Sequence, residues 1–495
     1  MSEVHHAPLL SDLRAALGEQ AVRVSTPEQA LREHLEDWRG RYRGQALAVV
    51  SPRTTPEVAT TVRLCAQHGV SIVPQGGNTS LVGGSVPDNS GQQIVLSLRR
   101  LREELSVDAD NLSMTAHAGF TLAEIQEAAR CVGLLFPLSL ASEGECTLGG
   151  VLATNAGGTQ VLRYGTAREL CLGLEVVTAQ GEVWSLLRGL RKDNTGYDLR
   201  HLLIGSEGTL GIITAASLKL FPAPRGTATA LVACETPDAA VALLRRARHS
   251  LDAGLTACEL MAPLPLALVR EHLPDVVSAL GQLPLPKLTA LSASSPWWLL
   301  LEVSSAASDA HAQTQLAELF EPAEVGVAGV ADVRLAQSLS QRGAMWRLRE
   351  AIPMAEKIAG RMVKHDIGLP TSRIPAFIQQ VDILLRERWP EARVVCFGHL
   401  GDGNLHFNVQ PPQPQAHAEA FEAFEQAVNQ LVFDTVEAMG GTLSAEHGIG
   451  ELRKQELARR HPTAALSAMQ AIKHALDPQG VLNPGRVLEA RPQAD

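Results

Sequence analysis

The sequence predicts an α+β protein with more than one domain, and three observations support this class. The chain has 495 residues, which is more than one ordinary hydrophobic core accommodates. Hydrophobic residues make up 45% of it, a share typical of a folded protein. Short apolar runs separated by glycine-rich turns occupy the first part of the chain, whereas strand–helix–strand patterns repeat in the second part.

An N-terminal helical segment is expected over residues 1–43, followed by a domain of short strands over residues 44–222. The apolar runs of this domain, such as ALAVV and GIITAASLKLF, alternate with turn residues. The stretch PEVATTVRLCAQHG has the spacing of a helix. The proline-rich stretch FPAPRG at 221–226 predicts the end of the domain.

A second pattern begins near residue 227. TATALVACE, PDAAVALLRRARHS and LTACELM predict a strand, a helix and a strand, and WWLLLEVSS, AHAQTQLAELF and AEVGVAGV repeat that order. Two β-α-β units in one region favour a ferredoxin-like sheet covered by helices. We therefore expect a ferredoxin-like substrate or cap domain over residues 227–430 and a C-terminal helical region over 431–495. Within the cap domain we expect helix around 335–360, a strand near 362–368, a helix near 371–388 and a strand–turn–strand at 393–410.

Charge and cysteine content exclude several classes of protein. With 43 basic and 53 acidic residues the formal net charge is −10, which repels phosphate backbones and disfavours a nucleic-acid partner. The seven cysteines form no C-x-x-C pair, so a reducing, cytoplasmic location is expected instead of a disulfide framework. The N-terminal residues do not resemble a signal peptide, and runs such as WWLLLEV are too short for a transmembrane segment. Peripheral contact with a membrane stays open.

Three glycine-rich segments, at 74–84, 146–158 and 204–214, form the first candidate site. Consecutive glycines let backbone N–H groups converge on one concavity, which suits a pyrophosphate. A tight surface turn is the commoner interpretation of any one such segment, but three within one domain suit an extended dinucleotide. The sequence has neither a Rossmann G-x-G-x-x-G after a strand nor a Walker motif.

These segments, with RKDNTGYDLRHLLIGSEGTLGIIT at 191–214, resemble the FAD-binding domain of the vanillyl-alcohol oxidase/p-cresol methylhydroxylase flavoprotein family. The resemblance covers roughly residues 44–222 and implies FAD between two α+β subdomains. Covalent members carry a His in the first loop, where this chain has Gly77-Asn78, so non-covalent FAD is expected. The implied cofactor-binding residues are Pro74, Gln75, Gly76, Gly77, Asn78 and Thr79 at the pyrophosphate, Pro137, Leu138, Ser142, Thr147, Gly150 and Asn155 along the flavin and ribityl chain, and Glu207 and Ile213 near the nucleotide end.

A second candidate site lies in FGHLGDGNLHFN at 397–408. Its Gly-Asp-Gly-Asn turn joins two extended runs and is expected to bring His399 and His406 into one neighbourhood. The pair Glu446-His447 follows in SAEHGIG. Two histidines around a turn are more often structural than metal-binding, but His, His and Glu together suit a borderline divalent metal with an open position for substrate.

The motifs HLGDGNLH and SAEHGIG resemble those of the FAD-linked D-2-hydroxy-acid dehydrogenases, and this likeness extends over nearly the whole chain. It implies that His399, His406 and Glu446 bind a divalent metal, with zinc as the first choice. It also implies that His447 is the general base. In such a site the metal would orient a D-2-hydroxy acid and favour ionisation of its hydroxyl, a neutral His would accept the proton, and the flavin would accept the hydride.

The same resemblance implies residues that bind the substrate carboxylates. Arg349, in a W-x-x-R-E pattern, and Lys364, fifteen residues later, match the positions that bind a distal carboxylate, and Asn408 matches one that holds the reacting end. For an isolated helical Arg, a solvated face is the commoner interpretation. The hydroxylated residue expected one turn later is Pro353 here, which removes one contact. D-2-hydroxyglutarate is the first choice of substrate, with D-lactate, D-malate or another 2-hydroxy acid open.

Other functions stay open at the level of sequence. An oxidase of the same fold that uses oxygen would differ only in packing near the flavin. A FAD-binding electron-transfer or assembly subunit would not need the set of His399, His406, Glu446 and His447. A nicotinamide enzyme is disfavoured because its fingerprint is missing. The resemblance implies an electron-transfer flavoprotein or a quinone as electron acceptor, and a homodimer is a candidate assembly.

Overall fold

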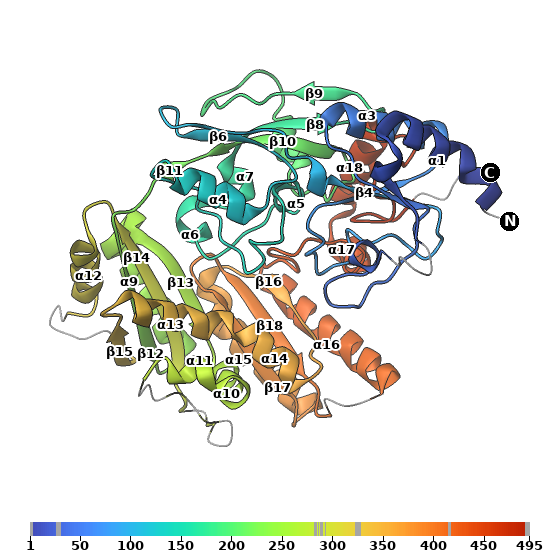
Figure 1. Cartoon of the computed structure of the whole chain (residues 1–495). Coiled ribbons are helices and arrows are strands. Elements are labelled where there is room, and N and C mark those ends of the chain that lie inside the picture. The colour runs from blue at the N-terminus through green and yellow to red at the C-terminus, as the bar shows by residue number, and fades with distance from the viewer. Residues whose placement is uncertain are drawn as a thin grey trace. The chain divides into compact units, whose positions relative to one another are not determined.

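The computed structural model describes residues 3–25, 31–281, 285, 287, 291–292, 294–321, 328–413 and 417–490. It confirms an α+β protein, whose chain folds into two compact units (Figure 1). The first unit comprises Met1–Gly158, Gly165–Ala223 and Glu446–Asp495, and the second comprises Thr159–Tyr164 and Pro224–Ala445. The C-terminal helical region expected over 431–495 is therefore divided between the two units.

The first unit contains a small sheet with the order β1-β2-β4-β3. Its strands β2 (Ala48–Val50), β4 (Ile94–Ser97) and β3 (Ile72–Gln75) are parallel, and β1 (Val22–Arg23) is antiparallel at one edge. The helix α3 (Thr55–Gln67), which begins at a cap where Thr54 accepts from Glu57 N, connects β2 to β3. The free edge of β3 is closed by residues 481–483, because Ile72 N donates to Val481 O (2.7 Å) and Asn483 N donates to Ile72 O (2.8 Å).

A second sheet in this unit is antiparallel, with the order β5-β6-β10-β8-β9. Its strands are β5 (Leu105–Asp108), β6 (Ser113–His117), β10 (Ile212–Lys219), β8 (Cys171–Val177) and β9 (Val183–Ser185). The helix α4 (Leu122–Arg130) starts at a capping box between Thr121 and Glu124. The remaining elements of the unit are α1 (Glu3–Leu17), η1 (Glu19–Ala21), α2 (Arg32–Leu35), η2 (Leu98–Arg100), β7 (Leu134–Leu135), α5 (Leu148–Ala153), α7 (Ala167–Leu170), α8 (Leu199–Leu203), β11 (Phe221–Pro222), α17 (Lys454–Arg460) and α18 (Thr463–Leu476).

The second unit is built on one antiparallel sheet with the order β15-β12-β14-β13-β17-β18-β16. The strands are β12 (Gly226–Cys234), β13 (Leu255–Met261), β14 (Trp297–Ser305), β15 (Val330–Leu335), β16 (Asp366–Gly368), β17 (Arg393–His399) and β18 (Asn404–Gln410). The units β12-α9-β13 and β14-α12-β15 give the order β15-β12-β14-β13, which confirms the ferredoxin-like arrangement. The last strand of these units, β15, begins at Val330, later than the expected strand AEVGVAGV at 323–330, of which residues 323–327 lie outside the described residues.

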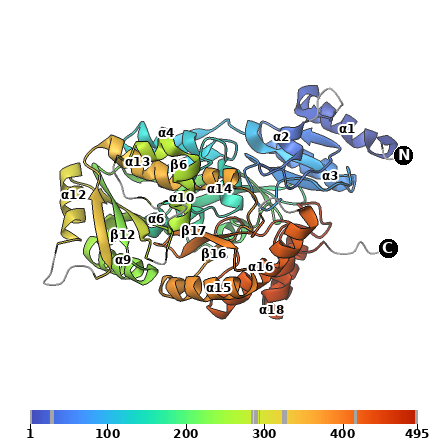
Figure 2. The ribbon, with the colours of Figure 1, turned by 90° about the horizontal axis from the view of Figure 1, so that it is seen from below.

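Helices cover both faces of this sheet. They are α6 (Val161–Tyr164), α9 (Pro237–Leu251), η3 (Asp252–Gly254), α10 (Pro263–His272), α11 (Pro274–Ser278), α12 (Asp309–Glu318), α13 (Leu339–Glu350), α14 (Ile352–Ala359), η5 (Thr371–Arg373), α15 (Ile374–Arg388) and α16 (Ala418–Ala438). The helices α9, α12, α15 and α16 pack on one face, where α15 and α16 lie side by side (Figure 2). The helices α10, α13 and α14 pack on the other.

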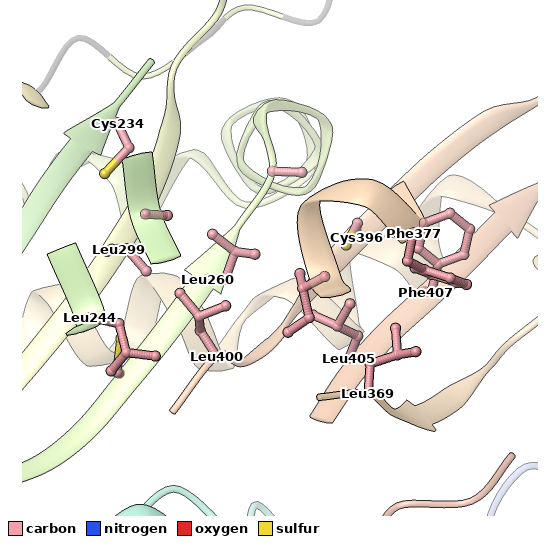
Figure 3. Packing of buried hydrophobic residues seen from close by; sticks show 14 of the residues in the cluster. Cys234, Leu244, Leu260, Leu299, Leu369, Phe377, Cys396, Leu400, Leu405 and Phe407 are labelled. Carbon is pink, nitrogen blue, oxygen red and sulfur yellow. The ribbon is translucent and has the colours of Figure 1, made fainter. Parts of the chain in front are cut away.

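Alternation along the strands assigns side chains to these two faces. Cys396 and Phe407 belong to the core under α15, where Phe377 meets Phe407 edge to face at 5.1 Å (Figure 3). Val395 and Phe397, which alternate with Cys396, belong to the core under α13 and α14. Polar residues of β13, β17 and β18 that share the face of Phe397 therefore meet α13 and α14. Among the described residues, no helix is long and apolar enough to span a bilayer.

Candidate active site

The first glycine-rich loop leaves the carboxyl end of β3, and side chains within it stabilise the loop itself. The buried Gln75 amide donates to the carbonyl oxygens of His34 (3.0 Å) and Ser85 (2.8 Å), and its oxygen contacts His34 Nδ1 (2.6 Å). Asn78 adopts a φ of 54° and donates to Glu36 O (2.8 Å). Burial lowers the pKa of His34. A phosphate at this loop would thus be bound through backbone N–H groups, not through the Gln75 or Asn78 side chains.

Gly76 and Gly77 of this loop pack so closely against residues 145–147 that a Cβ atom would not fit there. A Cβ on Gly76 would lie 2.4 Å from Thr147 Oγ1, and one on Gly77 would lie 2.1 Å from Glu145 O. The buried Thr147 hydroxyl has no hydrogen-bond partner among the described residues. Buried hydroxyls without partners are uncommon, so a polar ligand against this loop would complete the bonding of Thr147. These features fit the diphosphate or ribityl part of FAD.

The other residues expected to bind the cofactor lie in the same unit. Asn155, with a φ of 49°, follows α5 and accepts hydrogen bonds from Thr166 Oγ1 (2.9 Å) and Arg168 N (3.0 Å). Its side chain therefore stabilises a turn. The remaining positions are Pro74 at β3, Thr79 in the first loop, buried Pro137 and Leu138 after β7, Ser142 in the turn before Thr147, Gly150 in α5 and buried Ile213 in β10.

Glu207 connects the third glycine-rich segment to the loop that carries Glu446 and His447. Its carboxylate accepts from Ile449 N (2.7 Å) and Gly450 N (2.9 Å), and burial raises its pKa to about 7. The sequence predicts Glu207 near the nucleotide end of FAD, whereas its side chain in the structure is occupied by this loop. Glu207 therefore fixes the residues directly after Glu446 and His447.

In the second unit, the β17–β18 hairpin brings His399 and His406 together. His399 is the last residue of β17, His406 lies in β18, and their ring centroids are 5.8 Å apart. The ring of Phe397 lies 4.9 Å from that of His406. Asp366, opposite His406 in β16, accepts at its backbone oxygen from Ala445 N (3.1 Å). The residue before Glu446 is therefore held one strand away from His406.

A buried carboxylate, Glu259 of β13, links His399 to Arg349. His399 Nδ1 lies 2.7 Å from Glu259 Oε1, and Arg349 Nε donates to Glu259 Oε2 (2.9 Å). The Arg349 guanidinium also lies over the Phe397 ring, 4.7 Å from its centroid. Burial opposes ionisation of Glu259, but the charges of His399 and Arg349 outweigh it and lower its pKa. Sequence reasoning missed Glu259, whose one signal is an acidic residue inside the apolar strand LTACELM.

Lys364 and Asn408 share a second buried carboxylate, Glu356 of α14. Lys364 Nζ donates to Glu356 Oε2 (2.8 Å), and Asn408 Nδ2 donates to Glu356 Oε1 (2.6 Å). Glu356 is only 1% exposed. Pro353 lies in the first turn of α14, where a proline is tolerated, and marks the break between α13 and α14. Sequence reasoning missed Glu356, which gives Lys364 an internal counter-charge and Asn408 an internal hydrogen-bond acceptor.

Comparisons with known proteins agree with this architecture. Residues 46–187 match the family model described as FAD binding domain, and residues 223–487 match FAD linked oxidases, C-terminal domain. The chain is 37% identical over 470 residues, 95% of each chain, to D-2-hydroxyglutarate dehydrogenase of Xanthomonas citri pv. viticola. It is 34% identical over 496 residues, 98% of this chain and 84% of the relative, to the mitochondrial D-2-hydroxyglutarate dehydrogenase of Arabidopsis thaliana.

Solved structures share the fold at low sequence identity. A p-cresol methylhydroxylase with substrate bound superposes with a TM-score of 0.75 at 15% identity, covering 99% of this chain and 98% of the other. An alkyldihydroxyacetonephosphate synthase gives a TM-score of 0.73 at 19% identity, covering 96% of this chain and 84% of the other. These solved structures show the fold, and the family models and sequence relatives show that the chain belongs to the FAD-linked D-2-hydroxy-acid dehydrogenases.

Proposed function

We propose that this enzyme uses non-covalent FAD and a divalent metal to oxidise a D-2-hydroxy acid to the 2-oxo acid. The linkage of His399 to Arg349 through Glu259, with His406 beside His399, carries this proposal, because it places two imidazoles that could bind a metal near a cation that could bind a carboxylate. D-2-hydroxyglutarate is the first substrate to test, since the relatives that are 33–37% identical are named D-2-hydroxyglutarate dehydrogenases.

Each expected site residue has a chemical task in this proposal. His399, His406 and Glu446 would hold the metal, with zinc as the first choice because two imidazoles and a carboxylate suit it. A metal there would supply the positive charge that favours ionisation of the substrate hydroxyl, and FAD would accept the hydride. His447, adjacent to Glu446, would take the hydroxyl proton as general base.

The cofactor loop and the cations would orient the two reactants. The backbone of the first glycine-rich loop and the Thr147 hydroxyl would bind FAD, which needs no covalent bond because Gly77-Asn78 replace the His of covalent members. Arg349 and Lys364 would bind substrate carboxylates, and Asn408 would hold the reacting end.

A monocarboxylate such as D-lactate is the second candidate substrate, and Glu356 favours it. This buried carboxylate already neutralises Lys364 and bonds Asn408, and Pro353 offers no hydroxyl. A distal carboxylate would therefore meet an existing negative charge on the same ammonium group. Which of the two substrates is preferred depends on how much Glu356 lowers the affinity of Lys364 for a substrate carboxylate.

We further propose an electron-transfer flavoprotein or a quinone as electron acceptor, a cytoplasmic location and a homodimer as the assembly to test. The seven cysteines are all free thiols, which supports a reducing compartment.

Anaerobic bleaching of the flavin tests the proposed reaction. The purified holoenzyme is mixed with D- and L-2-hydroxyglutarate, lactate and malate, with and without prior chelation. The proposal requires bleaching by a D-acid, slower bleaching after chelation and recovery when Zn²⁺ is restored. Bleaching by L-acids alone would contradict the proposed substrate class. A bleaching rate that is the same with and without chelation would contradict the proposed role of the metal.

A further inference from the structure

Glu259 uses its two carboxylate oxygens for two residues with different proposed tasks. Oε1 contacts His399 Nδ1 at 2.7 Å, and Oε2 accepts from Arg349 Nε at 2.9 Å. The side chain is fully buried, and Glu259 is the direct cross-strand partner of His399 in the β13–β17 pair. Both contacts are therefore fixed by sheet register and by the packing of α13, which carries Arg349.

Each contact controls the orientation of a group that would meet a ligand. A carboxylate that accepts from Nδ1 keeps the proton on that nitrogen and directs Nε2 of His399 toward a metal. The Arg349 guanidinium is held at Nε by Glu259 and against the Phe397 ring, so its position is fixed before a substrate arrives. A planar guanidinium placed in advance loses less entropy on binding a carboxylate.

We propose that Glu259 is a positioning residue that couples metal binding by His399 to substrate-carboxylate binding by Arg349. This inference rests on the proposed function, because it assumes that His399 is a metal ligand and that Arg349 contacts substrate. One residue would then orient both the metal ligand His399 and the carboxylate-binding Arg349. Losing Glu259 should therefore weaken metal affinity and substrate affinity together, although its two oxygens are taken up by His399 and Arg349.

The same helix provides a matched control. Arg342, two turns before Arg349 on α13, pairs with buried Glu302 of the neighbouring strand β14 (3.1 Å). Trp346 Nε1 also donates to Glu302 (2.7 Å). This pair repeats the chemistry of Glu259 and Arg349 on the same helix and sheet, but Glu302 has no contact with His399 or His406 among the described residues.

The experiment compares Glu259→Gln and Glu302→Gln with the wild type as full-length, FAD-loaded protein. After chelation and dialysis, Zn²⁺ is titrated against a competing dye, and the KM for the best D-2-hydroxy acid is measured at saturating Zn²⁺. Glu259→Gln should lower Zn²⁺ affinity about 10- to 100-fold, the range found for residues that orient metal ligands. It should also raise KM more than it lowers kcat, whereas Glu302→Gln should lower only the melting temperature.

Failure of this inference and failure of the proposed function would give different results. The positioning role is overturned if Glu259→Gln binds Zn²⁺ as tightly as the wild type, or if Glu302→Gln loses as much Zn²⁺ affinity as Glu259→Gln. The proposed function would still stand in either case, provided that the wild type binds Zn²⁺ and its flavin is bleached by a D-acid. A wild type that binds no Zn²⁺ would overturn both. If Glu259→Gln does not fold, Glu259→Asp replaces it, since the shorter side chain keeps the charge but cannot reach both partners. Wild-type affinity for Zn²⁺ and substrate in Glu259→Asp would then reject the inference.

Discussion

Removing the charge of Glu356 is expected to shift the enzyme toward dicarboxylate substrates. Glu356 is 1% exposed and lies 2.8 Å from the Lys364 ammonium nitrogen. A distal substrate carboxylate on Lys364 would therefore share that nitrogen with Glu356. Glu356→Gln keeps the size of the side chain and an oxygen that can accept from Lys364 or Asn408, but it removes the negative charge.

The size of this shift follows from the distance between the two carboxylates. Two carboxylates on one ammonium group have charge centres about 6 Å apart, and at an effective dielectric constant of about 20 they repel by about 2.8 kcal/mol. Each 1.4 kcal/mol corresponds to about a tenfold change in an equilibrium constant, so the limit is about a hundredfold. The Lys364 side chain is 32% exposed, and water there screens part of the repulsion. We therefore expect about a tenfold effect.

The assay is the ratio of kcat/KM for D-2-hydroxyglutarate to kcat/KM for D-lactate. Glu356→Gln should raise this ratio, mainly through a lower KM for the dicarboxylate. Glu350→Gln is the control, because Glu350 is an exposed carboxylate at the end of α13 and its loss changes net charge equally. A ratio that is unchanged or lower in Glu356→Gln would refute the electrostatic argument, as would an equal rise in Glu350→Gln.

Three further predictions concern the cofactor loop, the base and Glu207. Gly77→Ala places a Cβ 2.1 Å from Glu145 O, which should distort the loop and lower bound-flavin absorbance per protein, whereas Gly144→Ala, with nothing within 4 Å, should not. Full flavin occupancy in both variants would contradict the role of this close packing in FAD binding. His447→Ala should reduce turnover about 10²- to 10⁴-fold with FAD retained, and wild-type rates would exclude a base at this position. Because burial raises the pKa of Glu207 from 4.5 to about 7, its contribution to the free energy of unfolding is fully present below pH 4.5 and is lost as pH rises through about 7. Urea unfolding of the holoenzyme should show this loss, and Glu207→Gln should flatten it; identical pH profiles would count against the shift.

Local patterns were sufficient to predict much of the fold. The two β-α-β units lie in continuous stretches of sequence, so their spacing alone predicts the ferredoxin-like order of β12 to β15. The hairpin around Gly-Asp-Gly-Asn was predictable for the same reason, because its turn residues stand between two extended runs. The approach of His399 to His406 follows from that hairpin.

Long-range contacts could not be predicted in this way. Glu259 is 140 positions from His399, and only the register of β13 against β17 makes them neighbours. Glu356 bonds to Asn408 across 52 positions, through the packing of α14 on the sheet. A single acidic residue in an apolar strand or helix gives no sign of its partner in one sequence. The sequence therefore identifies the residues expected to meet ligands, but not the carboxylates that hold them.

The closure of β3 by residues 481–483 has a consequence for how the protein is made. Synthesis proceeds from the N-terminus, so the edge of β3, and with it the base of the first glycine-rich loop, stays uncovered until residues 481–483 have left the ribosome. An open strand edge is a template for incorrect pairing. Chains that stop before residue 481 would therefore keep this edge open and would be prone to aggregate.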